Sequence, residues 1–269
     1  MRAYRIAYDG RPYHGFQRQP DVPTVEGAIL DALAALGVTE SETTVPDGYA
    51  AAGRTDAGVS ALAQTVAFEA PDWLTPAALN SELPADVRAW ASADVDAGFH
   101  ATHDAASRTY TYWLHAPDAD AERARAALDA LAGRHDYHNL TSDDENTVRN
   151  LSASLRVDEP FLIVTLRAGG FCRQLVRRVV ALVREVATGA ADREKIERVL
   201  GAEPIDGPEG VGPAPPYPLV LTDVSYPGVT FGVDAEAAAS AREVFREKRI
   251  ERAAGARVAG RIEGGIGES

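Results

Sequence analysis

Residues 53–61 of the chain read Gly-Arg-Thr-Asp-Ala-Gly-Val-Ser-Ala and lie between two apolar runs, residues 49–52 and 62–68. Two glycines flank the charged side chains of Arg54 and Asp56, and glycine permits backbone angles that other residues resist. The pattern predicts a strand, a tight loop and a second strand, with both charges held on the loop. Loops on rigid scaffolds often carry functional residues. Asp and Gly are also ordinary turn residues, so the residue types alone leave a plain hairpin turn open.

The elements around this loop follow the order strand-helix-strand-strand-helix-strand. Alternating apolar and polar residues predict strands, and apolar residues three and four apart predict helices. Thr24 is expected to cap the first helix and Gly37 to close it. The expected strands are residues 2–8, 49–52, 62–68 and 87–95, and the expected helices are residues 25–36 and 75–83. This order is that of a ferredoxin-like (split βαβ) unit.

The remainder of the chain repeats this theme. Strands are expected at residues 108–116, 151–157, 161–167 and 219–225, and helices at residues 118–131, 171–187, 192–200 and 234–252. Residues 141–146 and 207–218 are expected to be loops, the first of them mobile, and the tail after Gly255 is expected to be loosely held. We therefore predict an α+β fold with two domains, residues 1–104, which carry the 53–61 loop, and residues 105–269.

Length and composition narrow the class of protein. The chain has 269 residues, of which 45% are apolar, enough for a sizeable core in one large or two ordinary domains. No apolar run reaches the length that a membrane span needs, and residues 1–6 do not resemble a signal peptide. Cys172 is the single cysteine, so no internal disulfide can form. We expect a cytoplasmic protein without a membrane partner.

Four blocks of the sequence carry aromatic and charged residues in a distinctive order. They read Tyr-Asp-Gly and Tyr-His-Gly-Phe-Gln-Arg-Gln at residues 8–10 and 13–19, Gly-Arg-Thr-Asp-Ala-Gly-Val at residues 53–59, Phe-His-Ala and Arg-Thr-Tyr-Thr-Tyr at residues 99–101 and 108–112, and Gly-Phe-Cys-Arg-Gln-Leu-Val-Arg at residues 170–177. In type, spacing and order, these blocks resemble the motifs of the TruA family of tRNA pseudouridine synthases. Phe16 replaces the family's Trp, and Ser60 stands where the family often has His.

The resemblance implies a substrate and an assembly. It implies an RNA pseudouridine synthase that isomerises uridine in the anticodon stem-loop of tRNA, at positions 38 to 40, and that works as a homodimer. It also implies that the antiparallel sheets of the two halves join around a central cleft.

The reaction needs few chemical groups. Isomerisation breaks a C–N glycosidic bond, turns the base and forms a C–C bond, for which one carboxylate can act as nucleophile or as base. The resemblance implies that Asp56 is this catalytic residue and that Arg177 pairs with it, and a nearby guanidinium favours the ionised carboxylate. Whether Asp56 attacks the sugar or removes a proton stays open, and an exposed helix charge remains the alternative for Arg177. We expect no metal and no small-molecule cofactor.

Two further residues are expected to bind substrate. The resemblance implies that Tyr110 stacks on the target base, which must leave its helix and therefore needs an aromatic platform; a core tyrosine is the alternative. Arg54 is expected to contact an RNA phosphate, or else is a simple loop charge. The pairs His100/His103 and His135/His138 have metal-like spacing, but zinc needs three or four ligands, and we predict no metal site.

Two other functions compete with this interpretation. One is a catalytically silent RNA-binding protein of the same fold, against which the presence of Arg54, Asp56, Tyr110 and Arg177 argues. The other is a nucleoside hydrolase, which usually needs a second carboxylate beside the first, and the 53–61 loop offers none.

The net charge of −13 is unusual for a protein that binds RNA. Only Lys195 and Lys248 are lysines among the 27 basic residues, and the chain is rich in acids. High salt screens self-repulsion and lets a strongly acidic surface stay compact. Salt adaptation explains this composition, and the alternative is an ordinary acidic protein with no nucleic-acid partner.

This composition generates the first prediction. The protein should remain folded and active in molar salt and should unfold when the salt is diluted, because self-repulsion is then no longer screened. Circular dichroism and activity across a salt series measure both effects. Full stability in dilute buffer would contradict the salt-adaptation hypothesis.

Overall fold

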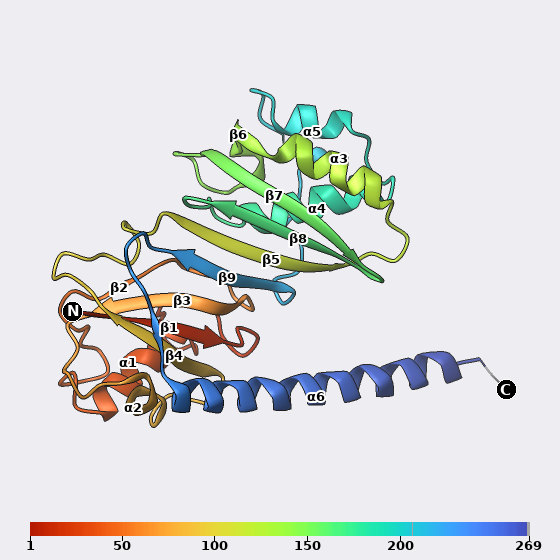
Figure 1. The fold of residues 1–269 in the computed structure, drawn as a ribbon. Coiled ribbons are helices and arrows are strands. Elements are labelled where there is room, and N and C mark those ends of the chain that lie inside the picture. The colour runs from red at the N-terminus through yellow and green to blue at the C-terminus, as the bar shows by residue number, and fades with distance from the viewer. Residues whose placement is uncertain (206, 268–269) are drawn as a thin grey trace.

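A computed structural model describes residues 1–205 and 207–267. The first half of the chain forms one end of a sheet (Figure 1). Its elements are β1 (Arg2–Tyr8), α1 (Val25–Ala35), β2 (Ala50–Ala51), β3 (Ser60–Phe68), α2 (Pro76–Asn80) and β4 (Val87–Asp94). The strands lie in the order β4-β1-β3-β2, and each neighbouring pair is antiparallel. Thr24 caps α1 as predicted, because its side chain accepts a hydrogen bond from the backbone N–H of Gly27.

The second half forms the other end of the sheet. Its elements are β5 (Ser107–His115), α3 (Ala121–Leu131), β6 (Gly133–Asp136), η1 (His138–Leu140), β7 (Val148–Asp158), β8 (Phe161–Ala168), α4 (Leu175–Ala187), α5 (Glu194–Val199), η2 (Gly207–Glu209) and β9 (Leu219–Ser225). The strands lie in the order β9-β5-β8-β7, again with antiparallel neighbours, and β6 adds to β7. This repeats the strand order of the first half.

The two ends join into one sheet between β3 and β9. These strands pair in parallel at Ser60–Val220 and Ala61–Leu221. The α+β class is confirmed, and in the described part of the chain the strands form a single mixed sheet of ten. The expectation of two antiparallel sheets missed this pairing, which closes two strand edges that would otherwise be unpaired.

A buried arginine extends the contact between β3 and β9. Arg5, which is 8% exposed, donates hydrogen bonds to the Ala63 carbonyl of β3 at 3.1 Å and the Val224 carbonyl of β9 at 2.6 Å. Its guanidinium also lies over the ring of Phe231, 4.2 Å from the centroid. The short parallel pairing is therefore supported by a side chain that reaches both strands.

The final segments return to the first half. β10 (Gly232–Val233) pairs with β4, and α6 (Ala235–Gly265) packs on β4 and α2. The predicted helix at residues 234–252 was too short, because α6 continues to Gly265. The described residues after Gly255 are all exposed, so that they are loosely held stays a prediction. Residues rich in Ala, Arg and Glu favour helix strongly enough to continue it through Gly255 and Gly260.

The helix that ends at Ala187 is shorter than predicted. We predicted residues 171–187, but α4 begins at Leu175 because Gln174 has φ 59°, in the left-handed region. A turn at residues 171–174 therefore precedes α4. Across residues 1–205 and 207–267, no helix has the length and apolar character needed to cross a bilayer.

The 53–61 loop packs tightly against the segment that follows β1. The backbone N–H of Gly10 donates to the Ser60 hydroxyl at 3.0 Å, and a Cβ placed on Gly10 would lie 1.9 Å from the carbonyl oxygen of Val59. Only glycine permits this approach. Ser60 thus links two of the four sequence blocks, and its hydroxyl accepts the bond.

This contact generates the second prediction. Gly10→Ala should lower the free energy of unfolding by about 1–3 kcal/mol, because the added carbon overpacks the loop. Gly53→Ala is the matched control, since no atom lies within 4 Å of its Cβ position, and it should be neutral or stabilising by up to about 1 kcal/mol. Urea unfolding in molar salt measures both variants. Equal stability of the two would show that the approach at Gly10 is not restrictive.

Candidate active site

The loop that carries Asp56 is fixed by its neighbours on both sides. The Thr55 and Tyr8 hydroxyls share a hydrogen bond of 2.7 Å, and the Thr55 carbonyl accepts a bond from the N–H of Phe16 at 3.0 Å. Val59 is buried in the apolar core of the second half, so the loop is held by both halves of the chain. Asp56 lies between these two attachments.

Asp56 forms an ion pair with Arg177, which lies in the first turn of α4. The Nη1 of Arg177 donates to Oδ2 of Asp56 at 3.0 Å, and its Nε donates to the Ala214 carbonyl at 2.7 Å. The side chains of Arg177 and Asp56 are 12% and 31% exposed. Arg177 is therefore no solvated helix charge, and its guanidinium fixes the position of the Asp56 carboxylate. Asp56 keeps enough exposure to meet a ligand.

Tyr110 lies close to this pair on β5. It is half-buried, packs against the cores of both halves and meets the ring of Phe171 edge-on at 5.2 Å. Burial raises the pKa of Tyr110 to about 12, the negative charge of Asp56 acts in the same direction, and Arg108 opposes them. The hydroxyl therefore stays neutral at physiological pH.

The two arginines nearest these residues in sequence have different roles. Arg54 is exposed, and among the described residues no hydrogen bond or ion pair holds its side chain, so it is free to meet a ligand. Arg108 instead donates to the carbonyls of Ala52 at 2.7 Å and Thr102 at 2.6 Å, and to that of Gly169. Sequence reasoning gave Arg108 no such role. No local pattern in the sequence indicated it, because the acceptor carbonyls lie on separate segments.

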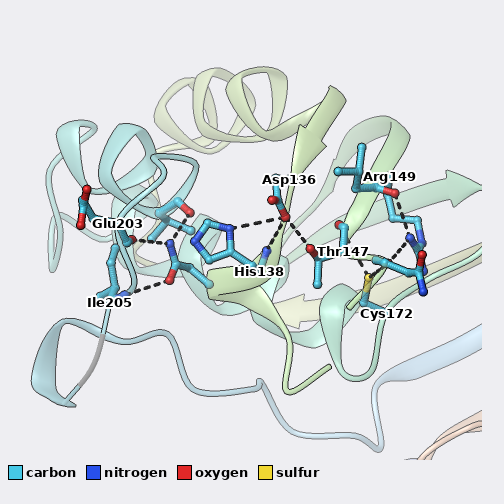
Figure 2. A network of polar contacts seen from close by, with 11 residues as sticks. Asp136, His138, Thr147, Arg149, Cys172, Glu203 and Ile205 are labelled. Atoms are coloured by element: carbon cyan, nitrogen blue, oxygen red, sulfur yellow. Dashed lines mark hydrogen bonds and ion pairs between the residues drawn. The ribbon is translucent and has the colours of Figure 1, made fainter. Parts of the chain in front are cut away.

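A polar network fixes the turn before α4 (Figure 2). The Cys172 thiol lies 3.6 Å and 3.8 Å from the carbonyl oxygens of Asn146 and Thr147. The Thr147 hydroxyl donates to Oδ1 of Asp136 at 2.6 Å, and the same oxygen accepts the backbone N–H of His138 at 3.1 Å. Cys172 is a buried structural residue.

The 141–147 loop is also bound to this turn. The Thr141 hydroxyl donates to the Arg173 carbonyl at 3.0 Å, and the N–H of Arg173 donates to Asp143 at 2.8 Å. The loop that the sequence suggested to be mobile is therefore attached to the turn that leads into α4. These contacts help to set the position of Arg177.

The histidine pairs do not form a metal centre in the described part of the chain. The rings of His100 and His103 stack 4.1 Å apart, and His135 Nε2 lies 2.8 Å from the Ala132 carbonyl oxygen. No group of three His, Cys, Asp or Glu side chains within residues 1–205 and 207–267 is placed to hold an ion.

The chain has relatives among known proteins. Residues 127–227 match the family described as tRNA pseudouridine synthase. The chain is 60% identical over 276 residues to tRNA pseudouridine synthase A of Haloarcula marismortui, covering 99% of this chain and 100% of the relative. It is 60% identical over 264 residues to the protein of that name in Natronomonas pharaonis, covering 97% and 98%. For the Archaeoglobus fulgidus protein, the identity is 39% over 236 residues, covering 86% of each.

A solved structure described as "Crystal Structure of a Cbf5-Nop10-Gar1 Complex" aligns with 68% of this chain and 54% of its own chain, at a TM-score of 0.31 and 10% identity. That likeness is too weak to bear on the fold. The near full-length identity, together with the family match, decides the assignment: the chain belongs to the tRNA pseudouridine synthase A family.

Proposed function

We propose that the protein isomerises uridine to pseudouridine in the anticodon stem-loop of tRNA, at positions 38 to 40, with Asp56 as the catalytic carboxylate. The observation that carries this proposal is the Asp56–Arg177 pair at 3.0 Å, beside Tyr110. A carboxylate held by an arginine, a neutral aromatic side chain on β5 and an exposed arginine on the 53–61 loop are groups that this reaction can use.

The reaction balances without an added reagent. The bond between C1′ and N1 breaks, the uracil turns, and a bond forms between C1′ and C5, while the proton on C5 is lost and N1 gains one. In these reaction steps, Asp56 acts either by attacking the sugar or by removing a sugar proton. Arg177 orients the Asp56 carboxylate, and Arg54 binds a phosphate of the substrate.

The division of the chain fits this role. We propose that residues 1–104 and 105–269 are two ferredoxin-like domains. The strand orders β4-β1-β3-β2 and β9-β5-β8-β7 support this division up to the end of β9, whereas β10 and α6 pack on the first domain. Asp56 then belongs to the first domain and Tyr110 and Arg177 to the second, on either side of a central cleft. We also propose that the enzyme is a cytoplasmic homodimer, as the family resemblance implies.

The third prediction concerns Asp56. Asp56→Asn should abolish pseudouridine formation, because the amide is neither a nucleophile nor a base, while tRNA affinity should persist, since the change removes a negative charge. Pseudouridine yield and tRNA affinity are measured on one preparation. Asp158→Asn, at the exposed end of β7, is the control for loss of a carboxylate. Unchanged yield in Asp56→Asn would falsify the catalytic assignment, and loss of both properties would call for a stability measurement, because Arg177 loses its charged partner.

The fourth prediction concerns Tyr110. Tyr110→Phe should keep most activity, whereas Tyr110→Ala should lose about 5- to 150-fold, which corresponds to about 1–3 kcal/mol of base stacking. Tyr112→Phe is the matched control, because the Tyr112 hydroxyl donates to the Pro215 carbonyl at 3.0 Å and has a purely structural partner. Activity is compared at salt concentrations where each variant is folded. If Tyr110→Ala matched the wild type, Tyr110 would be a core residue alone.

A further inference from the structure

The last helix has two distinct parts. Its beginning is packed, with Ala237, Ala238 and Ala241 buried, whereas every residue from 249 to 267 is exposed. Figure 1 shows α6 running along the first half and then extending beyond the body of the molecule. The 13 residues from 253 to 265 add about 20 Å of helix at 1.5 Å per residue. Packing against the rest of the chain therefore does not account for this exposed part of α6.

Ion pairs to a buried carboxylate anchor this helix. Lys248 and Arg252 both pair with Asp9, whose side chain is 3% exposed, and Lys248 pairs with Asp86 as well. A buried charge without a partner is costly, so Asp9 fixes the point at which α6 leaves the body. Asp9 directly precedes Gly10, which contacts Val59 and Ser60 of the catalytic loop. The exposed part of α6 therefore starts from the end of the sheet that carries Asp56.

One side of α6 is lined with arginine. Residues 242–265 contain seven basic and four acidic side chains, in a chain whose net charge is −13. Residues three, four or eight apart share a helix face, and such a face collects exposed arginines: Arg242, Arg246, Arg249, Arg257 and Arg261. From the first to the last, this face is about 28 Å long. Only Arg246 has an acidic partner among the described residues, the neighbouring Glu243 at 3.2 Å.

The chemistry of this face selects an anionic, extended partner. Exposed guanidinium groups bind phosphate oxygens through paired hydrogen bonds, and the spacing along a helix suits a row of phosphates better than one small anion. Arg11, two residues after Asp9, and Arg54, two residues before Asp56, are further exposed arginines. A second copy of this acidic chain is the competing partner. Val258, Ile262 and Ile266 are exposed on another side of α6 and would favour that contact.

We propose that the arginine face of α6 is a second tRNA-binding surface, which holds the sugar-phosphate backbone of the substrate while the catalytic loop acts on the uridine. The proposal rests on the proposed function, since its partner is the tRNA substrate. The free arginines favour RNA over a second copy because the helix face on which they lie carries no large apolar side chain except Ile250. Backbone contacts of this kind add affinity and orientation without sequence preference.

The fifth prediction tests this proposal with variants of the full chain in which arginines of α6 are replaced by uncharged glutamine. Arg249→Gln, Arg257→Gln and Arg261→Gln are combined in an Asp56→Asn background, so that binding is measured without turnover. The affinity for an unmodified tRNA transcript should fall about tenfold or more, and the slope of log affinity against log salt should decrease by about one per arginine. The matched control combines Glu247→Gln, Glu251→Gln and Glu263→Gln on the same exposed helix and should bind at least as tightly as the parent.

The outcomes separate the possibilities. Unchanged affinity and salt slope in the arginine variant would overturn the proposal, as would an equal loss in the glutamate variant, which would indicate a general effect on the helix. Sedimentation and circular dichroism are run on each variant, and an affinity loss that follows only from loss of a dimer would assign the face to a second copy. With Asp56 restored, pseudouridine yield tests the proposed function separately, because binding to α6 is measured without chemistry.

Discussion

The half-buried ion pair between Asp56 and Arg177 is the constraint on which the rest of the site depends. The two residues are 121 positions apart in the chain and 3.0 Å apart in space. Charges removed from water are costly unless good geometry and further hydrogen bonds offset the loss of hydration. The Ala214 carbonyl supplies such a bond to Arg177. Because the pair joins a loop of the first half to a helix of the second, the sheet must hold the two halves in a fixed relation.

Arginines inside the fold provide much of that fixed relation. Arg5 binds carbonyls of β3 and β9, Arg108 binds carbonyls of three separate segments, and Arg178 donates to the Val211 carbonyl at 2.6 Å. A guanidinium has five donors in a rigid plane and can serve several acceptors at once, which an ammonium group does less well. Part of the excess of arginine over lysine therefore has a structural reason, independent of salt and of RNA.

The distinction between arginines that bind backbone carbonyls and arginines that are exposed bears on how an acidic protein can bind RNA. Arg108 lies in one of the four blocks, yet its guanidinium is committed to backbone carbonyls. Other arginines are exposed and have no ion-pair partner among the described residues, among them Arg54 on the 53–61 loop and Arg242, Arg249, Arg257 and Arg261 along α6. A strongly negative molecule can still attract phosphate where its free cations are gathered on one surface, because screening confines each charge to a short range.

Local patterns were enough to predict most of the secondary structure and the loop that carries Asp56. Apolar alternation located the strands, and the Thr24 cap and the Gly and Pro positions located helix ends and loops, because each signal acts over a few neighbouring residues. The resemblance of four blocks added the family and named Asp56, Tyr110 and Arg177. β6 and β10 have too few residues to show a period.

The tertiary structure decided how these parts meet. The parallel β3–β9 pairing, the left-handed backbone of Gln174 that delays α4, and the backbone role of Arg108 leave no local pattern. In the sequence by itself, Asp56 and Arg177 are two isolated charges, and only the packing of two halves on one sheet brings them to 3.0 Å. Periodicity and capping depend on near neighbours along the chain, whereas an ion pair across the sheet depends on the whole fold being formed.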